Sequence, residues 1–198
     1  MLEFEEQNIQ ILDHTFRLAY AREFPTDNDP CYWASLWPSA LALAEHVLID
    51  KELAGKRVLE IGCGCGLAGI AAGKLGAEVT VTDLEPHALA LAAENWQLNE
   101  ISPAALHPLD WCEPTTHAQY DVVIGADILY SPSDFPDLVR NLNTLLDEEG
   151  SLIISEPGRP HAHNFFARML EAGYKINTQH YPIFLHEEHF EISVSELR

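Results

Sequence analysis

The sequence predicts an α/β fold, a doubly wound, Rossmann-like sheet of seven mostly parallel strands. Apolar segments typical of buried parallel strands alternate with helical segments of roughly 10–15 residues. A glycine-rich loop at residues 62–66 joins the first core strand to a helix, as in folds that bind nucleotide-like ligands at a helix N-terminus. The end of the chain reads as two long strands, which predicts a C-terminal antiparallel hairpin.

The first part of the chain predicts a small strand pair ahead of the core. Two alternating segments, residues 4–12 and 15–20, are separated by Asp13-His14. An aromatic segment follows, and a helix is expected at residues 38–49, because Pro38 suits a first helical turn. We expect one domain over residues 1–198, with a hairpin and cap segment at 1–36 and the core at 37–198.

The core elements follow from apolar periodicity and from glycine and proline positions. Gly76 suits the left-handed end of one helix, and the segment 121–128 is apolar on both faces. The helices are expected at residues 67–75, 86–99, 136–146 and 161–172. The core strands are expected at residues 58–61, 78–82, 106–109, 121–128 and 151–155, and the hairpin strands at 174–183 and 189–197.

The composition limits the function. The formal charge of −20, from 31 acidic and 11 basic side chains, disfavours nucleic-acid binding and would attract a cationic substrate, although it is also what a solvated acidic surface gives. The sequence contains neither a secretory signal nor an apolar run of about 18 residues, so no membrane span is expected. The four cysteines contain no C-x-x-C pair, so we expect no disulfide or zinc framework. A cytoplasmic monomer fits best.

Two groups of residues outside the loop carry side chains that could take part in chemistry. The histidine pairs His161-x-His163 and His186-Glu187-Glu188-His189 do not form the H-E-x-x-H pattern of a zinc helix, so no metal is expected. Arg159 follows the fifth core strand, and we expect it to form a surface ion pair, with contact to the substrate as the alternative.

The glycine loop fits two ligands by its letters. Gly64 to Gly69 satisfies the dinucleotide pattern G-x-G-x-x-G, with Asp83 about 20 residues further on. However, Glu60 and Gly62 extend the pattern to E-x-G-x-G-x-G, which is that of class I methyltransferases. A carboxylate suits the positive charge of S-adenosylmethionine and would repel a pyrophosphate. The chain also lacks the Tyr-x-x-x-Lys pair of short-chain dehydrogenases, so S-adenosylmethionine is favoured and a dinucleotide remains the alternative.

Several motifs support a more specific resemblance. They are, in chain order, Leu36-Trp37-Pro38, Val58-Leu59-Glu60-Ile61-Gly62-Cys63-Gly64-Cys65-Gly66-Leu67, Val81-Thr82-Asp83, Leu109-Asp110-Trp111 and Ala126-Asp127-Ile128-Leu129-Tyr130. This order resembles that of the family 16 methyltransferases, seven-β-strand enzymes that include many protein-lysine methyltransferases and are similar to the nicotinamide N-methyltransferase-like group. The resemblance is strong over residues 30–158 and loose at both ends.

The resemblance implies a set of cofactor contacts. The residues expected to contact S-adenosylmethionine are Trp37, Glu60, Gly62, Gly64, Asp83, Leu84, Asp110, Trp111 and Ala126. In this assignment Glu60 and the glycines line the methionine end, Asp83 holds the ribose, Leu84 and Asp110 lie at the adenine, and Trp37 caps the cofactor.

The resemblance also implies an activity. Asp127 would orient the acceptor amine and Tyr130 would wall its pocket, in an N-methyltransferase that acts on a protein lysine and releases S-adenosylhomocysteine. A small amine or heteroaromatic nitrogen is an alternative acceptor. A non-catalytic module that binds S-adenosylmethionine is an alternative of a different class.

Overall fold

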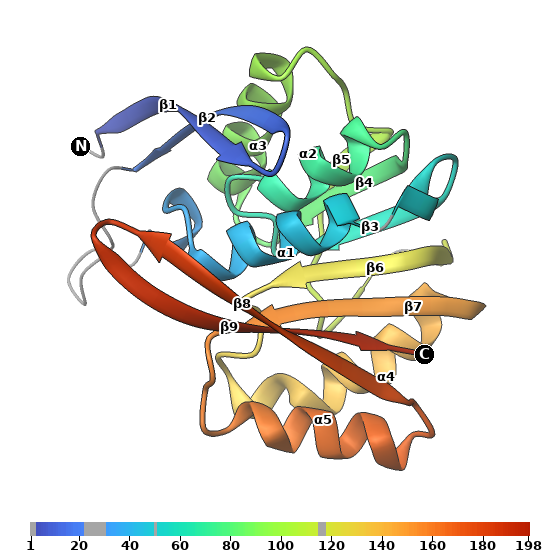
Figure 1. Ribbon diagram of the computed structural model, residues 1–198. Helices are drawn as coiled ribbons and strands as arrows, with labels where there is room; N and C mark the ends of the chain where they lie inside the picture. Colours follow the sequence, from blue (N-terminus) through green and yellow to red (C-terminus); the bar gives the residue numbers. More distant parts are fainter. Residues whose placement is uncertain (1–2, 22–30, 50, 115–117) are drawn as a thin grey trace.

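A mixed seven-stranded sheet forms the centre of the molecule (Figure 1). The computed structural model describes residues 3–21, 31–49, 51–114 and 118–198, so residues 22–30 of the expected cap segment lie outside the described residues. The strands, in spatial order, are β5 (Ala105–Pro108), β4 (Glu78–Asp83), β3 (Arg57–Ile61), β6 (Tyr120–Ala126), β7 (Leu146–Glu156), β9 (Glu188–Leu197) and β8 (Ile176–Leu185). The first five are parallel, and β9 and β8 form the antiparallel hairpin. The predicted fold class is confirmed.

Helices cover both faces of the sheet (Figure 1). On one face lie α1 (Pro38–Ile49), α2 (Leu67–Lys74) and α3 (Pro86–Leu98), and on the other lie α4 (Phe135–Leu145) and α5 (Ala162–Glu171). Alternation along β3 divides the core between these layers, because successive strand residues point to opposite faces. Val58 packs with the first group of helices, whereas Leu59 and Ile61 pack with the second. Glu60 therefore shares the face of Val58, beneath α2.

A separate two-stranded sheet precedes this core, as the sequence predicts. Strand β1 (Phe4–Ile11) pairs antiparallel with β2 (His14–Ala21). The sheet is held on α3 by two buried amides. Asn95 exchanges hydrogen bonds with the backbone of Ala19 and also donates to the carbonyl of Cys65 at 2.9 Å. Asn99 pairs in the same way with the backbone of Arg17. The hairpin is thereby tied to the glycine loop.

One strand differs clearly from its expected limits. Strand β7 begins at Leu146, whereas the sequence predicted residues 151–155. Its register shifts against β6 between the pairs Tyr120–Leu146 and Val122–Ser151, so a bulge accommodates the polar residues in between. The remaining elements begin and end within two residues of their expected limits.

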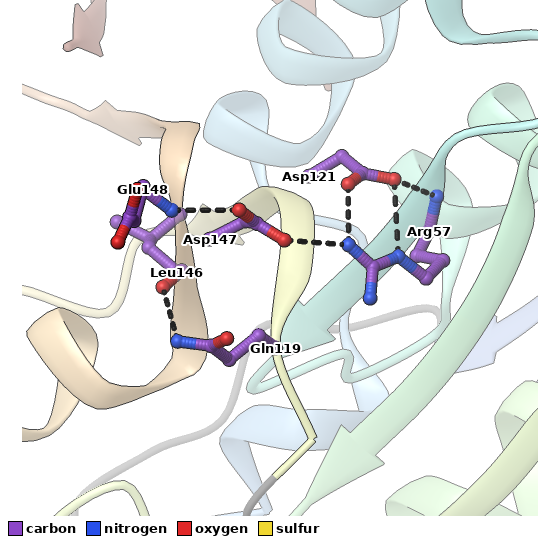
Figure 2. Close-up of polar contacts among 6 residues, drawn as sticks. All are labelled: Arg57, Gln119, Asp121, Leu146, Asp147 and Glu148. Atoms are coloured by element: carbon purple, nitrogen blue, oxygen red, sulfur yellow. Dashed lines mark hydrogen bonds and ion pairs between the residues drawn. The ribbon is translucent and has the colours of Figure 1, made fainter.

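An ion-pair network joins three strands at the edge of the sheet where the parallel strands begin (Figure 2). The Arg57 guanidinium lies 2.6 Å from Asp121 and 2.9 Å from Asp147, joining β3, β6 and the start of β7. Gln119 donates to the carbonyl of Leu146 beside it. The start of β7, whose polar residues do not predict a strand, is therefore held in the sheet by contacts with residues distant in the sequence.

Among the described residues, no helix is both long and apolar enough to span a membrane.

Candidate active site at the carboxyl ends of the strands

The glycine loop lies between the end of β3 and the start of α2, at the edge of the sheet where the parallel strands end. Gly62, Gly64 and Gly66 have φ of 63°, 51° and 78°, which disfavours any residue with a Cβ. A Cβ at Gly62 would lie 3.1 Å from the ring of Trp111, and one at Gly64 would lie 3.2 Å from the carbonyl oxygen of Trp33. The loop therefore presents bare backbone in a confined space.

Asp83 connects this loop to the end of β4. Its Oδ2 accepts a hydrogen bond from the backbone N–H of Gly64 at 3.0 Å, and Oδ1 accepts from Glu85 N–H at 3.0 Å. Burial raises the pKa of Asp83, and these N–H groups oppose that rise. Leu84, the next residue, is exposed. An acid and an apolar surface thus stand side by side next to the loop.

Glu60 lies beneath α2, with only 4% of its surface exposed. Its Oε1 accepts from the N–H of Gly69 at 2.9 Å. Its Oε2 has no hydrogen-bond partner among the described residues and lies where a Cβ of Gly69 would stand. Burial raises the pKa of Glu60 to about 8, although the Gly69 N–H opposes the rise. Burial therefore favours the protonated form of this carboxyl at neutral pH.

The segment after β5 provides an aromatic wall. Asp110 accepts from Cys112 N–H at 2.8 Å, which shapes the turn that carries Trp111. The amide of Asn141 on α4 donates to the carbonyl of Trp111 at 2.9 Å. The Trp111 ring contacts the position of Gly62 and meets the ring of Tyr130 edge-on, with 5.9 Å between centroids. The motifs after β3, β5 and β6 therefore converge.

Asp127 and Tyr130 follow β6, whose last residue is the partly buried Ala126. Asp127 adopts φ 54° and is held by a hydrogen bond from its N–H to the carbonyl of Ser155 at 2.8 Å. The left-handed backbone, rare outside glycine, turns the chain at the strand end. Tyr130 remains 54% exposed, and burial of its hydroxyl, together with nearby carboxylates such as Asp83, raises its pKa to about 12. The phenol therefore stays protonated at neutral pH.

Arg159 pairs with Asp127, which corrects the expectation of a surface ion pair. The carboxylate oxygen Oδ1 of Asp127 lies 2.9 Å from Nε and 2.8 Å from Nη2 of Arg159, and the Asp127 side chain is only 10% exposed. Burial raises the pKa of Asp127, and the guanidinium opposes that rise. Glu156, at the end of β7, accepts from the N–H of Arg159 and fixes the turn. The opposite charges of this partly buried pair offset each other.

Trp37, the expected cap, contacts Tyr32, whereas the neighbouring Trp33 contacts the glycine loop. The indole N–H of Trp37 donates to the carbonyl of Tyr32 at 2.8 Å, and the two rings lie 6.4 Å apart. Trp33, in the short helix Tyr32–Ala34, stacks on His87 and places its carbonyl against Gly64. Sequence reasoning missed Trp33, because only its place in an aromatic run marked it.

His161 and His163 contact backbone carbonyls, and the two cysteines of the glycine loop are buried. His161 and His163 each contact a backbone carbonyl, that of Leu129 at 3.0 Å and that of Pro160. The thiols of Cys63 and Cys65 are buried, which raises their pKa values. Within the described part of the chain, His, Cys, Asp and Glu form no group of three or more that could hold a metal ion.

Comparisons with known proteins agree with this geometry. The family model described as lysine methyltransferase matches residues 29–172. Protein N-lysine methyltransferase METTL21A of Danio rerio is 34% identical over 155 residues, covering 75% of this chain and 71% of that protein. Histone-arginine methyltransferase METTL23 of Rattus norvegicus is 32% identical over 124 residues, covering 59% of this chain and 55% of that protein. The solved structure of magnesium protoporphyrin IX methyltransferase from Synechocystis PCC 6803 with bound S-adenosylmethionine shares the fold, with a TM-score of 0.62 at 19% identity, over 80% of this chain and 77% of that chain.

Proposed function

The chain belongs to the lysine methyltransferase family of class I S-adenosylmethionine-dependent enzymes, and from that premise we propose that it methylates the ε-amino nitrogen of a lysine in another protein. The observation that carries the proposal is the placement of Asp127 and Tyr130 after β6, beside the glycine loop and Trp111. We further propose that residues 1–198 act as one domain and that the protein is a monomer. We place it in the cytoplasm, because a reducing compartment keeps free thiols such as that of Cys63 reduced.

The residues present fit the cofactor. Gly62 and Gly64 adopt left-handed backbone and carry no Cβ, so their main chain is open to close approach by a ligand. Glu60 adds a buried carboxyl with one unpartnered oxygen near the loop. When bound, S-adenosylmethionine supplies a methyl group on a positively charged sulfur. The residues that we propose to hold it are Trp37, Glu60, Gly62, Gly64, Asp83, Leu84, Asp110, Trp111 and Ala126.

Asp127 would act on the acceptor amine. A lysine with a reference pKa of about 10.4 must lose a proton first, which costs about 4.6 kcal/mol at pH 7. An isolated carboxylate would make this harder, because it stabilises the ammonium form. The Arg159 guanidinium offsets the charge of Asp127, so Asp127 can accept a hydrogen bond from the amine with little rise in the amine pKa.

Tyr130 would form the wall that aligns the acceptor. Its ring is held edge-on to Trp111, which restricts its position, while 54% of its surface remains exposed. Alignment of reacting groups can contribute roughly 7–11 kcal/mol, so a fixed aromatic wall is a sufficient catalytic device. A wall open to solvent suits a side chain presented by a large partner better than a small amine that must be enclosed.

An arginine is the second candidate acceptor. One relative is named as a histone-arginine methyltransferase, so that acceptor occurs among similar proteins. The Asp127–Arg159 pair favours lysine in this chain, because a guanidinium acceptor would meet the guanidinium of Arg159 beside the same carboxylate. Mass spectrometry of the methylated residue separates the two.

The proposal is tested with labelled S-adenosylmethionine and a cell extract. Label in protein, located on lysine, supports it. Label confined to the small-molecule fraction favours a small amine, and binding of S-adenosylhomocysteine without any turnover favours a non-catalytic module.

Variants then test the residues. Asp127→Asn should lower kcat by about 100-fold with unchanged binding of S-adenosylhomocysteine. Asp147→Asn is a matched control, since Asp147 also pairs with an arginine, at the opposite end of the sheet. If Asp127→Asn and Tyr130→Phe both turned over at the wild-type rate with saturating cofactor, these assignments would be wrong.

A further inference from the structure

A groove of about 380 Å³ lies between the N-terminal hairpin and the end of the C-terminal hairpin. Its lining includes Glu5, Gln7 and Ile9 of β1 and Phe184 of β8. A chain of hydrogen bonds runs from Tyr20 to Gln7 and from Gln7 to Glu5, at 2.9 and 2.7 Å, and fixes the polar side of the groove. Phe184 is 61% exposed on the other side. The groove thus combines an ordered polar wall with an exposed apolar ring.

Both strands that flank the groove have an open edge. Within the described residues β1 pairs only with β2, and β8 is the last strand of the large sheet, paired only with β9. An open edge offers unpaired N–H and C=O groups to any extended chain. Addition of a strand to such an edge is a common way of binding peptides, with main-chain hydrogen bonds giving affinity.

The charge around the groove has one sign. Neither β1 nor residues 176–197 contain a lysine or arginine. Carboxylates stand at Glu5 in β1 and at Glu187 and Glu188 at the tip of the C-terminal hairpin. Arg17 of β2, the nearest cation of the small sheet, is already paired with Glu6. The complementary occupant is therefore an extended basic segment.

The two hairpins that line the groove reach the edge of the sheet that carries the candidate active site. The last residue of β7, Glu156, pairs with Ser193, so residues 188–192 and the turn before them extend beyond the carboxyl end of β7 (Figure 1). On the other side, the ring of Phe4 in β1 lies 6.3 Å from the ring of Trp33, whose carbonyl abuts Gly64. A segment in the groove would thus run past the edge that carries the glycine loop.

We propose that this groove binds an extended basic segment of the protein substrate by strand addition, next to the lysine that is methylated. The inference rests on the proposed function, because it assumes a protein acceptor. Main-chain hydrogen bonds to an open strand edge hold the segment, Phe184 contacts its apolar side chains, and Glu5 and Glu187 attract its basic ones. Substrate choice then lies in the two terminal hairpins, outside the motifs that hold the cofactor.

The test uses a fluorescent twelve-residue peptide of alternating lysine and valine as the probe, with binding followed by anisotropy. The double variant Glu5→Lys, Glu187→Lys should weaken binding about tenfold, whereas the charge-matched control Glu94→Lys, Glu171→Lys, on exposed faces of α3 and α5, should change it less than about twofold. Phe184→Ala, which leaves the charge unchanged, should weaken binding about threefold.

A second probe separates strand addition from charge attraction. The same peptide with alternate backbone nitrogens methylated keeps every charge but loses main-chain donors, so its affinity should fall about tenfold. Equal losses in the groove variant and in its control, or full affinity of the methylated peptide, would overturn the inference. Retained binding of S-adenosylhomocysteine checks that each variant is folded.

The failure of this inference is distinct from failure of the proposed function. If the wild-type enzyme labels protein in an extract, and the groove variants label it with the same KM, only the groove assignment is wrong. If the wild-type enzyme labels no protein, the protein-methyltransferase proposal itself is wrong, and this inference falls with it.

Discussion

Glu60 offers a sharp test of the physical reasoning, because its buried carboxyl has one N–H donor and one unpartnered oxygen. Burial raises its pKa from 4.5 to about 8. A carboxyl whose pKa is raised on folding contributes stability that is fully present below the unfolded pKa and is lost as pH rises through the folded pKa. The wild-type protein should therefore become less stable between these two values. Glu60→Gln cannot ionise and should not show this loss.

The magnitude follows from linkage. A rise from 4.5 to about 8 corresponds to about 5 kcal/mol in the free energy of unfolding when the loss is complete, at about 1.36 kcal/mol per pH unit. Between pH values of about 5.5 and 8.5 the part that is lost amounts to about 3 kcal/mol, because some of the change occurs below this window and a little above it. The amide of the variant keeps an oxygen for the Gly69 N–H, and its other costs do not depend on pH.

Urea unfolding of both proteins at the two pH values measures this difference. The quantity of interest is the change with pH in the wild type minus the change in Glu60→Gln, because all other titrating groups cancel in that subtraction. The wild type should lose about 3 kcal/mol more than the variant as pH rises. Parallel losses in the two proteins would show that Glu60 is ionised throughout, and the reading of a protonated buried carboxyl would fail.

Other predictions follow from single contacts. Gly62→Ala, which combines φ 63° with a close approach to Trp111, should weaken binding of S-adenosylhomocysteine by more than about tenfold in calorimetry. Gly55→Ala, at φ 74° in open space, should not, and an equal loss there would refute the steric argument. Arg159→Ala removes the group that holds the pKa of Asp127 down, so the acid limb of the kcat profile should move to higher pH; an unmoved limb would exclude Asp127 as the titrating group. Asn95→Ala orphans buried backbone groups of the hairpin and should cost about 2–4 kcal/mol in urea unfolding, whereas a cost below about 0.5 kcal/mol would mean that the hairpin is held by other contacts.

Most of the fold could be predicted because its elements carry local patterns. The helix α1 was predicted at both ends from Pro38 and its apolar stripe, and β3 and β6 from apolar runs that a parallel sheet buries on both faces. The start of β7 could not be predicted in this way. Its first residues are polar, and they join the sheet through a bulge and the ion pairs of Arg57, which depend on partners 90 residues away along the chain.

In the candidate site, too, residues that belong to motifs could be predicted, whereas a partner outside the motifs could not. The resemblance to family 16 methyltransferases predicted that the glycine loop, Asp83, Trp111 and Tyr130 belong to one site, which agrees with their positions after strands that end at the same edge. The partner of Asp127 was not predicted, since Arg159 lies 32 residues away and belongs to no motif. One signal could have identified it. Arg159 follows β7, which is the neighbour of β6, so Arg159 and Asp127 lie at the same edge of the sheet.

The acidic character of the chain and the chemistry of lysine methylation pull in opposite directions, and the structure separates them in space. A charge of −20 draws in a basic partner but favours the ammonium form of its lysine, which cannot accept a methyl group. At the candidate site, however, Asp127, the carboxyl that we propose to meet the acceptor, is paired with a guanidinium, and burial favours the protonated form of Glu60. The pairing of Asp127 with Arg159 and the protonation of Glu60 therefore reduce the negative charge at the candidate site, where Asp83 and Asp110 remain. If the proposed groove and acceptor site are correct, a lysine that reaches Asp127 leaves the acidic surface for a carboxylate whose charge a guanidinium already offsets.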